Sequence, residues 1–177
     1  MSLTQITKEF KYLDINPIGN IGATVRLPNP NNMFEWTCTL MGPKDSLYKG
    51  GLFFLTIKFP SNYPNKRPEV FFKTPIYHLN VNPERPDLGH INISTLNFWK
   101  PEYNIKLVLC DIFKLLYKAN PECAYGSERA NEFRFNRELY EEKVKHFTKK
   151  FANFEVADKE HNESWNFSYY DKLIEIG

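Results

Sequence analysis

The chain has 177 residues, of which 42% are hydrophobic and 16% aromatic, and its formal net charge is +2. This length supports one domain with a sizeable core, and it is too short for two. Basic and acidic residues are interspersed, so the chain lacks the strong single-sign field that gathers phosphate backbones, and nucleic acid is not expected as a main partner.

No apolar stretch approaches the roughly 18 residues that a membrane span requires, so no membrane partner is expected. The three cysteines, Cys38, Cys110 and Cys123, are odd in number and form no CxxC pair. That pattern indicates neither a disulfide framework nor a zinc site, and we expect no metal and no cofactor. A reducing compartment, the cytoplasm or the nucleus, fits this use of cysteine.

The first half of the chain predicts one helix followed by four strands. Apolar residues recur at helical spacing behind Ser2, a good N-cap, until Pro17: these are Leu3, Ile6, Phe10 and Leu13. Residues 21–27, 33–41, 51–59 and 69–73 are short runs rich in apolar and β-branched residues, separated by Pro, Asn and Gly. This spacing is typical of an antiparallel four-stranded meander, and alternation along 34–40 places Cys38 in the core.

The second half predicts a long loop and three helices. Residues 74–103 show no sustained periodicity, which makes this loop long enough to be functional. Residues 105–119 are apolar almost all round, Leu107 included, and predict a central buried helix that ends at Asn120-Pro121. Ser127 and Asn136 each suit the N-cap of a further helix. The fold class is therefore predicted to be α+β.

The segment from 152 to 177 is polar at first and then rich in aromatic and aliphatic residues. So much apolar surface is unfavourable in water. We therefore predict a domain over residues 1–151 and an aromatic-rich C-terminal extension over 152–177, which packs on its own domain as a strap or helix. A partner-docking peptide is the alternative.

A series of turn and loop residues carries a resemblance to the ubiquitin-conjugating enzyme family. Met41-Gly42-Pro43, Tyr48-x-Gly50-Gly51, Phe59-Pro60, Tyr63-Pro64, Pro68, Tyr77-His78, Gly89, Trp99-x-Pro101 and Asn120-Pro121 occur in that family's order and nearly its spacing. The resemblance covers roughly residues 2–151 and implies the UBC-like fold, with an N-terminal helix, a four-stranded antiparallel meander, a central helix and two C-terminal helices. The RWD domain, a structural adaptor, shares the Tyr-Pro-x-x-x-Pro element, but Trp99-x-Pro101 favours the conjugating enzymes.

The family accepts ubiquitin as a thioester on a cysteine three residues after a glycine, and here Asn92 follows Gly89 at that spacing. Counting back from Trp99 would instead select Ile91. Neither residue carries sulfur, and a carboxamide has no accessible deprotonated state that could form an acyl intermediate. The resemblance therefore implies a catalytically inactive variant, a pseudoenzyme.

Four further residues belong to this vestigial site. The family's His-Pro-Asn motif is present as His78-Leu79-Asn80, in which the family's asparagine stabilises the oxyanion; a purely structural loop residue is an equal interpretation of Asn80. His78 is predicted to be a packed, hydrogen-bonded loop residue rather than a base. Cys123 is a candidate displaced nucleophile, although no Lys, Arg or His stands within two residues of it, and Ser94 would need a base that the sequence does not supply.

By the same resemblance, Lys8 and Lys11 of the first helix correspond to the region that contacts the activating enzyme. Asn65, Pro101 and Glu102 correspond to ligase-contacting loops, although the family often has an apolar residue at the position of Asn65. The expected partners are ubiquitin or a ubiquitin-like protein, a conjugating enzyme or a ligase. Three functions remain open: a non-catalytic binding protein, an active enzyme that uses Cys123 or in which Asn92 is an engineered replacement of cysteine, and an RWD-like adaptor.

Overall fold

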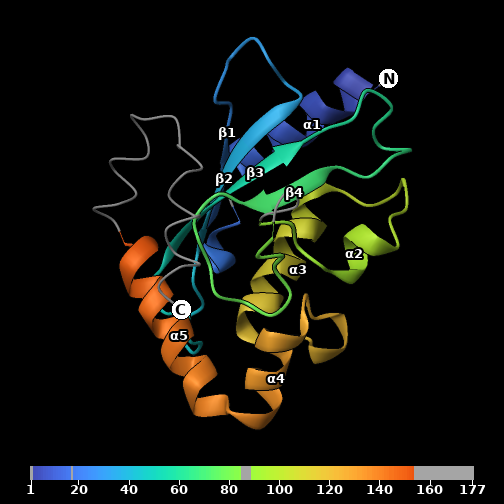
Figure 1. The fold of residues 1–177 in the computed structure, drawn as a ribbon. Coiled ribbons are helices and arrows are strands. Elements are labelled where there is room, and N and C mark those ends of the chain that lie inside the picture. Colours follow the sequence, from blue (N-terminus) through green and yellow to red (C-terminus); the bar gives the residue numbers. More distant parts are fainter. Residues whose placement is uncertain (1, 17, 85–88, 154–177) are drawn as a thin grey trace.

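The computed structural model describes residues 2–16, 18–84 and 89–153, and they form one sheet with helices around it (Figure 1). The strands are β1 (Ala23–Arg26), β2 (Glu35–Met41), β3 (Leu52–Lys58) and β4 (Glu69–Phe72). The α-helices are α1 (Ser2–Ile15), α2 (Ser94–Asn97), α3 (Ile105–Tyr117), α4 (Ser127–Phe135) and α5 (Arg137–Phe151). Two 3-10 turns, Gly19–Ile21 and Pro121–Cys123, complete the described elements.

The sheet is the predicted antiparallel meander, with strand order β1-β2-β3-β4. Trp36 pairs with Ile57 and Cys38 with Leu55, so that the apolar sides of β2 and β3 face the same way. All four of these residues are fully buried. Burial also raises the pKa of the Cys38 thiol to about 12, so Cys38 is a core residue, as the alternation predicted. The predicted α+β fold class is confirmed.

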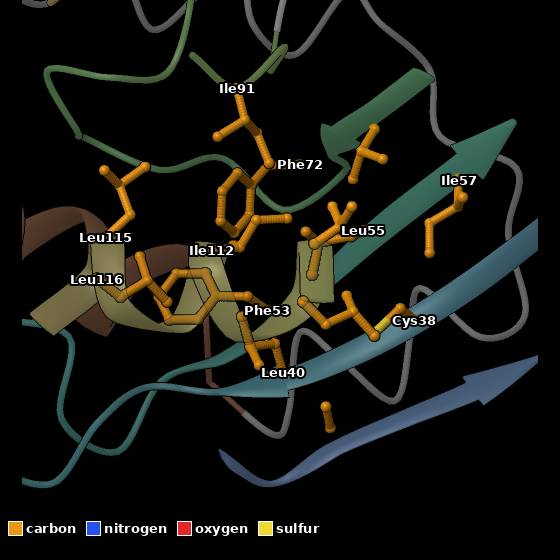
Figure 2. Packing of buried hydrophobic residues seen from close by; sticks show 14 of the residues in the cluster. Cys38, Leu40, Phe53, Leu55, Ile57, Phe72, Ile91, Ile112, Leu115 and Leu116 are labelled. Atoms are coloured by element: carbon orange, nitrogen blue, oxygen red, sulfur yellow. The ribbon is translucent and has the colours of Figure 1, made fainter. Parts of the chain in front are cut away.

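Helix α3 supplies the other half of the core. Its inward residues Ile112, Leu115 and Leu116 lie against side chains of β2, β3 and β4 (Figure 2). Leu107, by contrast, is 37% exposed, which corrects the prediction of a helix buried almost all round. One face of α3 therefore remains in contact with solvent, because the sheet covers only the opposite face.

Two predicted helix starts are also corrected. Ser2 is the first residue inside α1 rather than its N-cap, and its hydroxyl donates to the Ser61 carbonyl. Ser127 is the first residue inside α4, whose N-cap is Gly126 with φ of +72°. Asn136 does cap α5, since its side chain accepts a hydrogen bond from the Leu139 amide at 3.4 Å.

Glu9 on α1 joins three segments of the fold, a role that the sequence pattern did not reveal. It is buried, and its carboxylate accepts hydrogen bonds from the Tyr63 hydroxyl at 2.7 Å and from the Ile105 amide at 2.9 Å. The second bond satisfies a free amide in the first turn of α3, where a negative charge is also favoured by the helix dipole. Glu9 therefore fixes α1 against the start of α3.

In the described part of the chain, no helix is both long and apolar enough to cross a membrane. Helix α5 ends at Phe151, and the predicted self-packing of the extension concerns residues that lie, beyond Asn153, outside the described ones.

Candidate functional site

Asn80 sits where the loop after β4 meets the segment between α3 and α4. Its carboxamide NH2 donates to the Asn120 carbonyl at 2.6 Å and to the Cys123 carbonyl at 2.7 Å, and its Oδ1 accepts from the Asn120 amide at 2.8 Å. The residue is fully buried. Since a carboxamide has only two N–H donors, both donors of Asn80 are already used within the fold.

Asn92 lies directly beside Asn80 and the 120–123 turn. Its backbone amide donates to the Asn80 carbonyl at 2.8 Å, and its side-chain NH2 donates to the Cys123 carbonyl at 2.9 Å. Its Oδ1 accepts a hydrogen bond from the Asn97 side chain. Asn80, Asn92 and the 120–123 turn thus form one network of amides and carbonyls, which we term the amide cluster.

Gly89 explains how the chain reaches this position. It has φ of +79°, and a Cβ added there would lie 2.3 Å from the Phe72 carbonyl oxygen, so only glycine allows this approach to β4. The Phe72 amide donates to the Gly89 carbonyl at 2.8 Å, which docks the segment onto the sheet. Two residues later Ile91 is 4% exposed and points into the core beside Phe72 (Figure 2). Asn92, which is half-buried, is left at the surface of the site.

His78 is fully buried and uses both ring nitrogens. Its Nδ1 accepts from the Asn80 amide at 2.9 Å, so the proton lies on Nε2, which donates to the Leu115 carbonyl at 3.1 Å. Burial, aided by the positive charge of Arg129, lowers the pKa of His78 to about 4, even though the Leu115 carbonyl favours the protonated form. The imidazole is therefore neutral near pH 7 and holds the turn between Asn80 and α3.

This lowered pKa predicts a pH dependence of stability. The unfolded chain takes up the proton near the ordinary pKa of 6.5, whereas the folded chain resists it down to about 4. The neutral His78 therefore contributes up to about 3 kcal/mol to the free energy of unfolding. This contribution is complete above pH 6.5 and is lost as the pH falls towards 4. Denaturant unfolding of the native chain across this pH range should show the loss. His78→Gln, which does not titrate, should have a flatter profile, and identical slopes in the two proteins would contradict this assignment.

Neither of the two proposed replacement nucleophiles is hydrogen-bonded to a base among the described residues. The Cys123 side chain is half-buried, and among residues 2–16, 18–84 and 89–153 nothing forms a hydrogen bond or ion pair with its sulfur. Its carbonyl, not its thiol, enters the amide cluster. Ser94 is exposed at the start of α2, and no described residue makes a hydrogen bond to its hydroxyl.

Two residues that support the site were missed by the sequence analysis. Asn120 is half of the exchange of hydrogen bonds with Asn80, and its own side chain accepts from the Glu122 amide at 3.0 Å. Arg129 on α4 is half-buried; its guanidinium donates to the His78 carbonyl at 3.2 Å and lies over the Tyr77 ring, 4.4 Å from the centroid. Asn120-Pro121 indicates a helix end and belongs to the family resemblance, but neither reveals the bonds between Asn120 and Asn80, and an arginine on a polar helix gives no sequence signal of a buried contact.

The predicted partner-contacting residues lie in two other places. Lys8 and Lys11 are exposed on α1. Asn65, Pro101 and Glu102 are exposed on two loops that the Trp99 indole joins, since its N–H donates to the Pro64 carbonyl at 2.7 Å. The structure therefore brings the three loop residues to one end of the molecule. Helix α1 borders this end, because Glu9 is bonded to Tyr63 and Ile105 and Lys8 lines a pocket with Asn104.

The carboxamides and carbonyls of the amide cluster offer hydrogen bonding, since carboxamides are neither acids nor nucleophiles near neutral pH. The neighbouring His78 imidazole is buried and bonded through both ring nitrogens. Within the described residues no group of three or more His, Cys, Asp or Glu side chains could hold a metal ion.

Comparison with known protein families identifies a match. A family model described as "Ubiquitin-conjugating enzyme" matches residues 5–148, which includes every described element from α1 to α5 in whole or nearly whole. The match agrees with the element order of the fold: an N-terminal helix, a four-stranded meander, a central helix and C-terminal helices.

Proposed function

The chain belongs to the ubiquitin-conjugating enzyme family, and we propose that it is a non-catalytic member, a pseudoenzyme that acts by binding rather than by thioester transfer. The observation that carries the proposal is Asn92. It follows Gly89 at the spacing where the family resemblance places the acceptor cysteine, and its side chain, unlike that of Ile91, lies at the surface of the site. A carboxamide there removes the covalent route altogether.

The state of Asn80 supports the same proposal. The oxyanion role that the resemblance implies requires an N–H donor free to point at a developing negative charge. Both side-chain donors of Asn80 are engaged by the Asn120 and Cys123 carbonyls, so the residue holds the 120–123 turn in place. Its presence is explained by folding alone and does not argue for activity.

The proposed partners are ubiquitin or a ubiquitin-like protein, an active conjugating enzyme, or a ligase, and the proposed compartment is the cytoplasm or nucleus. The end of the molecule that carries Asn65, Pro101 and Glu102 offers an exposed, preformed surface for such contacts. Asn65 is polar, so a ligase contact there would depend on hydrogen bonding rather than on an apolar anchor. The family match favours this role over that of an RWD adaptor.

Cys123 remains the alternative nucleophile, because its backbone carbonyl accepts a hydrogen bond from the side chain of Asn92. The missing base argues against it, since a reactive cysteine needs a neighbouring group that favours the thiolate. The two possibilities differ in a directly measurable way.

The decisive experiment is a charging assay. We expect that incubation with activating enzyme, ATP and ubiquitin gives no reductant-sensitive adduct on a non-reducing gel, while an active conjugating enzyme in a parallel reaction gives one. A matched Cys123→Ser variant separates the alternatives. An adduct that forms on the native chain and is lost in that variant would show that Cys123 is the nucleophile and that the protein is an enzyme.

A further inference from the structure

A groove lies between the β2–β3 connection, the end of α3 and the helices α4 and α5. Its volume is about 680 Å³. Its apolar lining comes from all of these segments and includes Leu47, Leu115, Leu116, Pro121 and Phe133. Tyr117 also lines it and is 62% exposed. The groove is large enough to take several apolar side chains of a peptide.

The charged residues around the groove favour an acidic occupant. Lys44 and Lys118 are exposed on opposite segments of its lining, and neither forms an ion pair with any residue in the described ranges. Arg137 is paired with Glu141 at 2.8 Å, and its guanidinium lies over the Phe133 ring, 4.1 Å from the centroid. Because Arg137 and Glu141 neutralise each other, the remaining charges of the lining are those of two lysines and one carboxylate, that of Asp45.

The chain beyond α5 starts at the base of the β2–β3 connection, another part of which lines this groove. The Leu52 amide donates to the Ala152 carbonyl at 2.8 Å, so the end of α5 is fastened to the start of β3. The same point is the base of the β2–β3 connection, which the Gly42 amide closes by donating to the Gly51 carbonyl at 2.8 Å. The other part of that connection, from Lys44 to Tyr48, lines the groove.

The chain after α5 is long enough to reach back to the groove. From Glu141, in the lining, to Ala152 the helix rises roughly 17 Å at 1.5 Å per residue. An extended chain covers roughly 3.3 Å per residue, so about six residues after Asn153 span that distance. Every residue from about 160 onward can therefore reach the groove.

The composition of residues 154–177 complements both the apolar lining and the positive charge of the groove. The segment has six acidic residues and two lysines, and its acidic residues are Glu155, Asp158, Glu160, Glu163, Asp171 and Glu175. Its apolar residues are concentrated from Trp165 onward, where they alternate with polar ones. Large aromatic side chains are those that gain most from an apolar groove.

We propose that residues 160–177 of this chain dock in this groove, with aromatic side chains against its apolar lining and carboxylates beside Lys44 and Lys118. The docked segment covers Ala119 and Pro121, which flank the Asn120 of the amide cluster. It therefore braces the turn that Asn80 and Asn92 hold. This inference is independent of the proposed non-catalytic role, because it would apply equally to an active member of the family.

Hydrogen–deuterium exchange on the full chain tests the proposal. In the native protein, amides of residues 160–177 should exchange more slowly than a random coil. The double variant Lys44→Glu, Lys118→Glu should lose this protection while β2 and β3 keep theirs, because both lysines are exposed and outside the core. A matched double variant on α1, Lys8→Glu with Lys11→Glu, has the same change in net charge and should leave the protection intact. Trp165→Ser should speed exchange in residues 44–48 and 117–121.

Three results would overturn the proposal. Residues 160–177 of the native chain could exchange at random-coil rates, which would mean that they are not docked. Protection that survives the groove variant would place the segment elsewhere on the molecule. Protection that falls on dilution would identify a second copy of the chain, rather than the same copy, as the source of the docked segment.

Discussion

Asn92→Cys is expected to form a reductant-sensitive adduct with ubiquitin in the presence of activating enzyme and ATP, whereas the native chain is expected to form none. The substitution removes the carboxamide that donates to the Cys123 carbonyl and puts a thiol at the same half-buried position. The two donors of Asn80 continue to hold the 120–123 turn without it. Charging requires a thiolate that can reach the incoming thioester, and the substitution supplies the sulfur for it.

Ile91→Cys is the matched control for this experiment. It moves the same thiol by one residue, to a side chain that is 4% exposed and points into the core beside Phe72. We expect no adduct on this variant. Charging of Ile91→Cys without charging of Asn92→Cys would show that the acceptor position had been assigned one residue too late. No charging of either would show that the loops around the site, and not only the nucleophile, prevent thioester formation.

Leu109→Ala is expected to lower the free energy of unfolding by about 2 to 5 kcal/mol. Leu109 is fully buried on α3 in the core formed with the sheet residues Trp36, Phe53 and Leu55. Truncation loses the transfer free energy of the removed carbons and leaves a cavity that the surrounding β-sheet cannot fill. Denaturant unfolding followed by circular dichroism measures the loss.

Leu107→Ala makes the same chemical change two residues earlier on the same helix. Because Leu107 is 37% exposed, its truncation removes less buried surface than that of Leu109 and should cost clearly less. The difference between the two variants isolates burial from helix propensity, which is the same in both. Equal losses would mean that α3 does not present Leu109 to the sheet.

Several features of this fold could be predicted because they depend on neighbours in the sequence. The period-two alternation of β2 placed Trp36 and Cys38 in the core, and both are fully buried. Asn136 was identified as a cap because a cap acts on amides two or three residues ahead. The turn and loop residues that suggested the conjugating-enzyme family act in the same local way, and the family is confirmed by the match over residues 5–148.

The corrected helix starts show where local preference is outweighed. Ser2 and Ser127 are both good capping residues, yet each lies inside its helix. The Ser2 hydroxyl instead donates to the carbonyl of Ser61, 59 residues away. A capping preference is worth about 1 kcal/mol, so a tertiary contact of similar strength can replace it.

The sequence by itself determined the order of α1, the four strands, α3, α4 and α5, the inward faces of the strands and the absence of sulfur at the position of Asn92. It did not reveal the short helix α2, Ser94–Asn97, which lies within the segment predicted to be a loop. Only the tertiary structure decided that Asn92 rather than Ile91 faces the site, that Asn80 has no free donor and that Glu9 is buried against α3. The physical reason is the range of the interactions. Periodicity and capping depend on residues within a few positions, whereas Asn80 is satisfied by carbonyls 40 and 43 residues away and Glu9 by an amide 96 residues away. Those partners are brought within hydrogen-bond distance only when the sheet and α3 pack together.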